Sequence, residues 1–418
     1  MPRVMLILPT ETYRATPFLH AAEELGLQVV VASNEAPTLA TLMEGRVLTL
    51  DLRHPAESAE RAMEFAARWH IDAVVGVDEG SVLTAAAVAE RLGTQRRNLV
   101  AAVAATRDKR LLRARLTGAV LPQPRYAVID AGAGDQAIDS AIGVTGFPCV
   151  IKPVDLAASR GVIRADDRGA AHVAVRRVAA LVRELCEGGS VPQLLVESYI
   201  DGVEVAVEGL VHEGVLEVIA VFDKPDPLIG PFFEETIYVT PSRLAAAAKA
   251  AVGDAVSNAV SALGLRHGPV HAEVRMAADS AVVIEVAARS IGGLCSQVIR
   301  LECDDAPGDV RSLENVILRE ACGLPLGRIH MVDRACGVFM LPIPTAGILR
   351  GVAGLSSAES VAGITGVTIS IPIGEPVRPL PEGDRYLGFI FARGHAPHTV
   401  ETSLREAQSR LGVDITPV

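Results

Sequence analysis

The stretch HGPVHAEVRMAADSAVVIEVAARSIGG, residues 267–293, largely decides the fold prediction. Its two apolar segments flank a short polar turn and predict a β-hairpin, with Glu273 in the first strand and Glu285 in the second. A turn over Ala278–Ser280 sets the two carboxylates opposite each other on one face, roughly 5 Å apart. Carboxylates that close repel each other unless a cation lies between them, and Mg²⁺ suits oxygen ligands of this kind.

A salt-bridged hairpin is the alternative, with Arg275 or Arg289 as the counter-charge. Arg289 follows Glu285 at an even spacing and should point to the same face. Gly292 and Gly293 then open the backbone and leave room for a substrate. The hairpin alone does not decide between a metal site and an ion pair.

The nearby histidines invite a zinc interpretation that the sequence does not favour. The HExxH zinc motif requires a helix, and Gly268-Pro269 disfavours one between His267 and His271. We expect His271 to contact a substrate or to support a metal ligand instead.

Composition excludes several classes of protein. The chain has 418 residues, enough for two or three domains, and a net charge of −11 without a basic run, which argues against nucleic acid as a main partner. No apolar run reaches the ~20 residues needed to cross a bilayer. Six scattered cysteines without a CxxC pair indicate a reduced, cytoplasmic protein.

Lysine is rare enough to be informative. Only four of the 39 basic residues are Lys, so arginine serves wherever a generic cation suffices. Lysine supplies a compact charge that the planar guanidinium does not reproduce, and the remaining lysines are therefore candidates for specific roles. The four are Lys109, Lys152, Lys224 and Lys249, of which the last lies in an Ala-rich helix and is expected on a solvated face.

Residues 1–100 alternate between strands and helices and predict a doubly wound parallel sheet. The expected strands are Val4–Leu8, Val29–Ala32 and Ala73–Val77, and the expected helices are Pro17–Leu25, Pro55–Trp69 and Ser81–Leu92. No GxGxxG motif follows the first strand, so a dinucleotide site is not expected. Asp78-Glu79-Gly80 ends a strand and either contacts a ligand or caps the next helix.

Two further segments indicate an anion site. The strand FPCVIKP ends near Lys152 and is followed by a loop in which Ser159 and Gly161 are small and Arg160 is charged, so backbone N–H groups can approach an anion closely. Downstream, Glu197 ends a strand and Glu204 follows a tight turn, a pair that suits an adenine amine and a ribose diol. The alternative is that Glu204 lies on the solvated face of an edge strand and binds no ligand.

The segment VIAVFDKPDPLIGPFFEETIYVTPS, residues 218–242, gathers aromatic and charged side chains in a Pro- and Gly-rich loop. They are Phe222, Lys224, Phe232, Phe233, Glu234, Glu235 and Tyr238. Such a mixture favours the wall of a small-molecule pocket, with Glu234 and Glu235 as substrate contacts. A packed hairpin corner is the alternative.

Taken in order, these elements resemble the ATP-grasp ligases over roughly residues 1–325. The motifs that carry the resemblance are Lys109, Lys152 with its small-residue loop, Glu197-Ser198-Tyr199-Ile200, Glu204, Glu273 and Glu285-x3-Arg289. The tail is similar to the C-terminal domain of the L-amino acid ligases, the dipeptide-forming branch. The resemblance implies a multidomain α/β and α+β protein with an N-terminal α/β domain (1–100), an ATP-grasp domain (101–325, small lobe about 115–200) and a small β-rich C-terminal domain (326–418).

The resemblance also implies roles for the residues. Lys109 and Lys152 would hold the ATP phosphates, with Lys152 and Arg289 catalytic. Adenine would contact Glu197, Tyr199 and Ile200, and ribose would contact Glu204. Glu273 and Glu285 would hold Mg²⁺, with Mn²⁺ as the alternative ion. One departure is that Ala287 stands where the family has a metal-ligating Asn, which leaves the number of ions open.

The implied activity is ATP-dependent amide formation through an acyl phosphate, with release of ADP and phosphate. The expected partners are small-molecule carboxylate and amine substrates, with an amino acid as one of them, and neither nucleic acid nor membrane. A homodimer is left open. The alternatives are an ATP-grasp carboxylase that uses bicarbonate and a nucleotide-binding regulatory protein without turnover.

Overall fold

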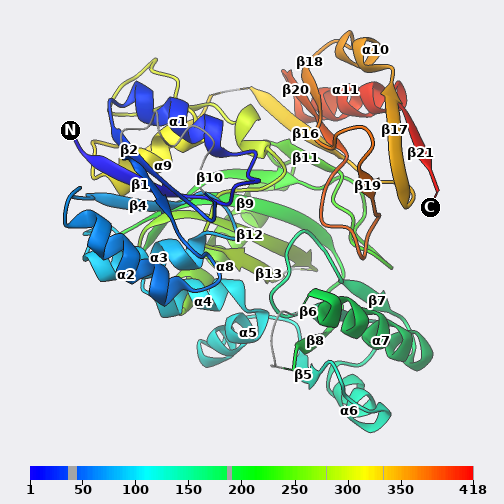
Figure 1. The fold of residues 1–418 in the computed structure, drawn as a ribbon. Helices are drawn as coiled ribbons and strands as arrows, with labels where there is room; N and C mark the ends of the chain where they lie inside the picture. Colours follow the sequence, from blue (N-terminus) through cyan, green and yellow to red (C-terminus); the bar gives the residue numbers. More distant parts are fainter. Residues whose placement is uncertain (36–44, 186–190, 279, 333, 418) are drawn as a thin grey trace.

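The computed structural model describes residues 1–418 except 36–44, 186–190, 279, 333 and 418 (Figure 1). Its N-terminal part contains a parallel sheet of strand order β3-β2-β1-β4. The elements are β1 (Arg3–Ile7), α1 (Ala15–Glu24), β2 (Gln28–Ser33), β3 (Val47–Thr49), α2 (Pro55–Ala66), β4 (Ala73–Gly76) and α3 (Val82–Leu92). The predicted strands and helices are confirmed to within a few residues; β3 was not predicted.

Alternating side chains of β1 explain why helices cover both faces of this sheet. Met5 and Ile7 pack with residues of α2 and α3, whereas Val4 and Leu6 belong to the core that α1 shares with α9 (Leu313–Ala321). Each face buries apolar side chains, as a doubly wound sheet requires. The doubly wound prediction for this part of the chain is confirmed.

A small lobe projects from the body of the molecule at the lower right of Figure 1. Its antiparallel sheet has the order β5-β8-β6-β7, and helices α6 and α7 supply the other half of its core. The elements are β5 (Tyr126–Asp130), α6 (Asp135–Thr145), β6 (Cys149–Pro153), β7 (Ile163–Ala165), α7 (Arg168–Leu185) and β8 (Gln193–Ser198). Helices α4 (Val100–Arg107) and α5 (Lys109–Gly118) connect the lobe to the N-terminal part.

An eight-stranded sheet of order β13-β12-β9-β10-β11-β16-β20-β18 forms the centre of the molecule. Its strands are β9 (Val203–His212), β10 (Val215–Asp223), β11 (Ile237–Thr240), β12 (Gly268–Ala277), β13 (Ser280–Ala287), β16 (Ala335–Leu341), β18 (Ile364–Ile369) and β20 (Gly388–Gly394). Helix α8 (Ala246–Leu263) packs on β9, β12 and β13 through its buried valines. Strands from the predicted C-terminal domain thus continue the sheet that contains the hairpin.

The remaining elements belong mostly to the last quarter of the chain. They are η2 (Cys295–Val298), β14 (Leu301–Cys303), β15 (Ile329–Met331), β17 (Gly347–Ala353), α10 (Leu355–Glu359), β19 (Pro376–Val377), α11 (Pro397–Ser409) and β21 (Gly412–Thr416). Strands β19, β17 and β21 form a separate three-stranded sheet. The sequence also predicts a final amphipathic helix over Val400–Leu411, and α11 confirms it. The domain boundaries near residues 100 and 325 stay predictions.

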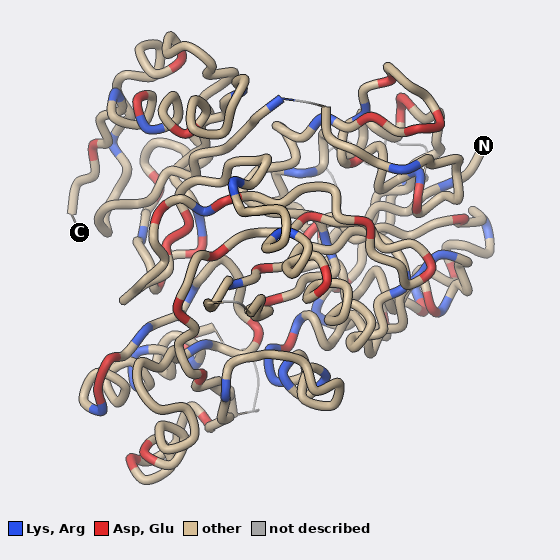
Figure 2. Tube along the Cα trace, turned by 180° about the vertical axis from the view of Figure 1, so that it is seen from behind, with Lys and Arg blue, Asp and Glu red and all other residues tan. Residues whose placement is uncertain are grey.

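Charges of both signs are interspersed along the described trace in Figure 2. Among the described residues, no helix is long and apolar enough to span a membrane.

Candidate active site

The hairpin pairs the two glutamates, but not by the predicted turn. Ala277 pairs with Ser280, so Ser280 begins β13 and is not a turn residue; Asp279 lies outside the described residues. This register alone would set Ile284 opposite Glu273 and turn Glu285 to the other face. A β-bulge after Glu273 inserts one residue, and Glu285 becomes the partner of Glu273. The bulge, and not the turn, brings the two carboxylates together.

The two carboxylates open onto a cavity of about 920 Å³ between the small lobe, the central sheet and the N-terminal part. Most of the residues predicted for the site line it. These are Lys109, Lys152, Ser159, Glu197, Tyr199, Ile200, Glu204, Glu235, His271, Glu273, Glu285, Arg289, Gly292 and Gly293. Ile284 also lines the cavity, because a bulge turns two adjacent side chains toward one face.

Glu273 and Glu285 do not pair with Arg275 or Arg289, the two arginines of the salt-bridged alternative. Arg275 Nε lies 2.7 Å from Glu204 Oε2, and Arg289 donates to Glu79. Lysines take their place: Lys109 Nζ lies 3.4 Å from Glu285, and Lys224 Nζ lies 3.0 Å from Glu273.

Lys224, which the sequence singled out without assigning a role, lies among three carboxylates. Its Nζ is 2.7 Å from Glu204 Oε1 and also donates to Glu235 and Glu273. Burial opposes the charged form, but the three carboxylates outweigh burial and raise the pKa of Lys224 well above its usual value. One oxygen from each glutamate lies within 4.8 Å of the others, so these residues also fit a divalent cation.

Glu197 is held from two sides at the junction of the small lobe and the hairpin. Lys152 Nζ lies 2.8 Å from Glu197 Oε2, and Arg113 Nε donates to Glu197 Oε1. Arg113 also donates to the carbonyl of Ile284 in the bulge, at 2.7 Å. Sequence analysis missed Arg113, because its position in a basic helix resembles that of a solvated arginine.

Lys109 is placed by a helix start. Asp108 caps α5, and its side chain accepts hydrogen bonds from the backbone N–H groups of Arg110 and Leu111. The Lys109 ammonium then reaches the loop after β6 and donates to the carbonyl of Leu156 at 2.7 Å.

The N-terminal part contributes Glu79. From the sequence, its segment was expected either to contact a ligand or to cap the next helix. Its carboxylate accepts from Arg289 and Arg107, and both Asp78 and Glu79 line the cavity. Glu79 therefore holds Arg289 from the side of the N-terminal sheet.

His271 contributes a neutral polar group to the cavity wall. Burial and, after it, the charge of Arg289 lower the pKa of His271 to about 3. Within the described part of the chain its Nδ1 has no hydrogen-bond partner, and neither has Oε1 of the buried Glu208 behind it. Glu208 Oε2 accepts from the N–H of Ile291 at 2.8 Å, which fixes the backbone just before Gly292.

Three residues predicted for the site do not line this cavity. Glu234 borders only a smaller neighbouring hollow, whereas the adjacent Glu235 borders both that hollow and the cavity. Arg160 and Gly161 contact residues 378–386, a Pro-rich segment that we call the strap. The Gly161 N–H donates to Pro381 at 2.8 Å, and Arg160 lies 3.0 Å from Asp384. The strap, which comes from the C-terminal part, thus binds the Gly161 N–H and the Arg160 guanidinium, the groups that were expected to face phosphate.

Of the predicted pocket wall, Phe233 and Tyr238 line the cavity. Phe222 is instead fully buried in the core, and Phe232 is partly buried against the core of the small lobe. Tyr386, at the end of the strap, also lines the cavity and lies 3.4 Å from Glu235.

The strap is also joined to the small lobe by an ion pair, in which Arg177 donates to both oxygens of Glu382 at 2.6 and 3.0 Å. If the cavity binds ATP, as the resemblance implies, we expect Glu382→Gln to raise the KM for ATP by about fivefold at most, because an exposed pair contributes about 0.2–1 kcal/mol. The difference should shrink at high ionic strength. Glu406→Gln, which breaks a pair with Arg410 inside α11, is the matched control. Identical KM values at low salt would contradict the prediction.

Two buried carboxyl groups should make the fold sensitive to acid. Burial opposes ionisation, but Arg289 and Arg107 outweigh it and lower the pKa of Glu79 from 4.5 to about 2. Arg113 and Lys152 do the same for Glu197. A carboxyl whose pKa is lower in the folded state contributes stability above its unfolded value, and this stability is lost as the pH falls.

We therefore expect the free energy of unfolding to fall from about pH 4.5 toward pH 2. Denaturant titrations across this window measure the slope. Glu79→Gln should lower stability at neutral pH and flatten the slope, and an unchanged slope in this variant would speak against the assignment.

Comparisons with known proteins cover most of the chain. Family models match residues 19–94 (ATP-grasp N-terminal domain), 145–298 (ATP-grasp domain) and 339–416 (L-amino acid ligase C-terminal domain 2). An alanine–anticapsin ligase of Bacillus subtilis is 28% identical over 252 residues, 56% of this chain and 52% of that protein. An uncharacterized protein of Sinorhizobium fredii is 26% identical over 72% of this chain and 60% of its own length. The chain thus spans little more than half the length of these curated relatives.

Among solved structures, an L-amino acid ligase from Bacillus licheniformis superposes with a TM-score of 0.81 and 25% identity, covering 100% of this chain and 99% of that one. A carboxyaminoimidazole ribonucleotide synthase from Aspergillus clavatus in complex with ATP gives a TM-score of 0.72 at 15% identity over 98% of this chain and 99% of that chain, which supports the shared fold alone.

Proposed function

Because the chain belongs to the ATP-grasp superfamily, we propose that it is an ATP-dependent carboxylate–amine ligase that joins an amino acid to a second amino acid or amine. The observation that carries the proposal is the convergence of Lys109, Lys152, Glu273, Glu285 and Arg289 on one cavity. The matches to the L-amino acid ligase C-terminal domain and to the alanine–anticapsin ligase support an amino acid as substrate.

In the proposed reaction a substrate carboxylate attacks the γ-phosphate of ATP and gives an acyl phosphate and ADP. The amine then attacks the acyl carbon, phosphate leaves, and the amine's protons pass to phosphate and solvent. Little covalent chemistry is asked of the protein, so positioning and charge neutralisation dominate. Lys109 and Lys152 neutralise phosphate oxygens, and Arg289 stabilises charge that develops on the transferring group.

The charges of the site support a requirement for Mg²⁺. Each lysine that reaches the cavity already faces a carboxylate: Lys109 faces Glu285, and Lys152 faces Glu197. The negative charge of a triphosphate therefore needs cations that these lysines do not supply alone. Glu273 and Glu285 would hold Mg²⁺, which would neutralise phosphate oxygens when bound. Glu235, beside Glu273, offers the oxygen that Ala287 does not.

Cytoplasmic residence is part of the proposal. The five cysteines that the structure describes, namely Cys149, Cys295, Cys303, Cys322 and Cys336, are free thiols, which fits a reducing compartment.

The test is to incubate the full chain with ATP, Mg²⁺ and pairs of amino acids and to score both ADP release and product mass. Ligase activity predicts ADP release that depends on both substrates. The product should have the summed mass of the two substrates less one water, as expected for an amide. ADP release that depends on bicarbonate without an amine would instead indicate a carboxylase. ATP binding without ADP release would indicate a regulatory nucleotide-binding protein.

A further inference from the structure

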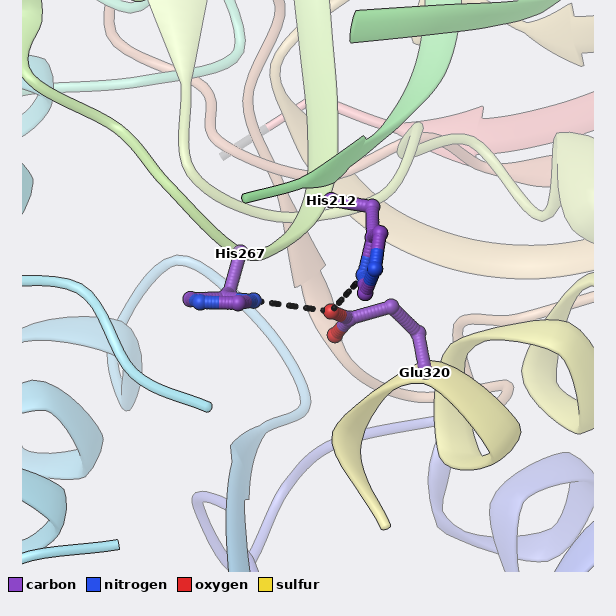
Figure 3. Close-up of side chains that lie close together, drawn as sticks. All are labelled: His212, His267 and Glu320. Atoms are coloured by element: carbon purple, nitrogen blue, oxygen red, sulfur yellow. Dashed lines mark hydrogen bonds and ion pairs between the residues drawn. The ribbon is translucent and has the colours of Figure 1, made fainter. Parts of the chain in front are cut away.

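The side chains of His212, His267 and Glu320 meet where β9 ends and β12 begins (Figure 3). His212 ends β9, His267 precedes β12, and Glu320 lies near the end of α9. The Nδ1 atoms of His267 and His212 lie 2.9 and 3.3 Å from Glu320 Oε1. The Glu320 side chain is only 2% exposed, so this is a buried carboxylate faced by two imidazoles.

A positively charged side chain, Arg96, already faces this cluster. Arg96 Nη1 lies 3.0 Å from His212 Nδ1 and 3.4 Å from Glu320 Oε1. Arginine only donates, so Arg96 donates to the lone pair of His212 Nδ1 and to Glu320 Oε1. His267 Nδ1 faces the same carboxylate oxygen. The acceptor atoms of His212 and Glu320 therefore converge on a cation, which is the position that a metal ion would take.

The separations suit a transition-metal ion. Zn²⁺ binds imidazole nitrogen and carboxylate oxygen at about 2.0–2.2 Å in a tetrahedron, which sets ligand atoms about 3.3 Å apart. The distances of 2.9 and 3.3 Å to Glu320 Oε1 are close to this value. A cavity of about 80 Å³ lined by Arg96, His267 and Glu320 leaves room for a water as the fourth ligand.

The backbone of His267 is held in place for such a role. The Asn98 side chain accepts from the N–H groups of Arg266 and His267, at 2.6 and 3.0 Å, and donates to the carbonyl of His267 at 2.7 Å. A ligand on a fixed backbone loses little conformational freedom when it binds an ion, so the site is partly preorganised.

We propose that His212, His267 and Glu320 form a binding site for Zn²⁺ or a similar divalent ion that prefers imidazole, and that Arg96 moves away when the ion binds. The site is separate from the proposed Mg²⁺ site. His267 precedes Glu273 of the proposed Mg²⁺ site by six residues at the start of β12, a strand length of about 20 Å. The inference therefore stands or falls independently of the ligase activity.

The experiment is a calorimetric titration of Zn²⁺ into the full chain with excess Mg²⁺ present to occupy the oxygen-rich site. We expect one tightly bound Zn²⁺ per chain. His212→Ala should weaken binding by more than about tenfold, since even outer-shell partners contribute that much. Arg96→Ala should tighten binding, because it removes the competing cation. Zn²⁺ should raise the melting temperature of the wild type but not that of His212→Ala.

The control is His172→Ala. His172 also contacts two carboxylates, but through opposite ring nitrogens, with Asp135 on Nδ1 and Asp139 on Nε2, so its contacts do not converge. His212 is half exposed, and its replacement should leave the fold intact, which circular dichroism would verify. Wild-type Zn²⁺ affinity in His212→Ala, or an equal loss in His172→Ala, would overturn the proposal, as would the absence of Zn²⁺ binding to the wild type.

Discussion

Arg289→Ala is expected to lower the turnover of ADP formation by about 10²–10³-fold, the usual effect of removing one positioned donor at developing charge. The side chain lines the cavity and is 15% exposed. Burial opposes its charge, but the Glu79 carboxylate outweighs burial and raises the pKa of Arg289 further. The guanidinium is therefore charged and held in place before any substrate enters.

The measurement is ADP release under saturating substrates, with folding checked by circular dichroism. Arg311→Ala is the matched control, because Arg311 is a buried arginine paired with Asp305 and Asp309 and does not line the cavity. Wild-type turnover in a folded Arg289→Ala protein would remove Arg289 from the mechanism. Glu79→Gln should have a smaller effect on kcat, since it leaves the guanidinium present but less well positioned.

Arg113→Met is expected to have the largest effect on stability, about 3–5 kcal/mol, because it breaks a buried ion pair by removing one partner. The Arg113 side chain is 1% exposed and reaches Glu197 and the carbonyls of Val283 and Ile284. Its loss leaves Glu197 with Lys152 alone and deprives two carbonyls at the bulge of their donor. Urea unfolding followed by fluorescence and circular dichroism measures the loss.

Two further variants separate this cause from a general loss of packing. Arg110→Met on the same helix, with a side chain 39% exposed, should cost far less. Arg113→Met combined with Glu197→Gln should recover part of the stability, since no unpaired charge then remains buried. A loss below about 1 kcal/mol in Arg113→Met would contradict the buried ion pair.

The sequence predicted the parts of the fold that rest on periodicity. The alternation of strands and helices in residues 1–100 and the two strands of the hairpin follow from apolar spacing, and both are present. The turn was predicted wrongly because a β-bulge leaves no periodic signal. Only the pairing of Glu273 with Glu285 after the shift reveals it.

Contacts between residues that lie far apart along the chain were the ones missed. Arg113 meets Glu197 84 positions away, and Arg289 meets Glu79 210 positions away. No local pattern encodes such contacts. Lys224 was the intermediate case, because the scarcity of lysine marked it as unusual, but its place among three carboxylates depends on the packing of β9, β10 and β12.

The continuity of the eight-stranded sheet limits how this protein can be divided or recombined. Ile237–Thr240 of β11 pair with Cys336–Phe339 of β16, across the boundary predicted near residue 325. A truncation there would expose an apolar strand edge, which invites aggregation. A chimera that exchanges the C-terminal part with that of a relative must therefore preserve the pairing of β11 with β16. Grafting at the linker alone would place strands side by side whose side chains do not pack together.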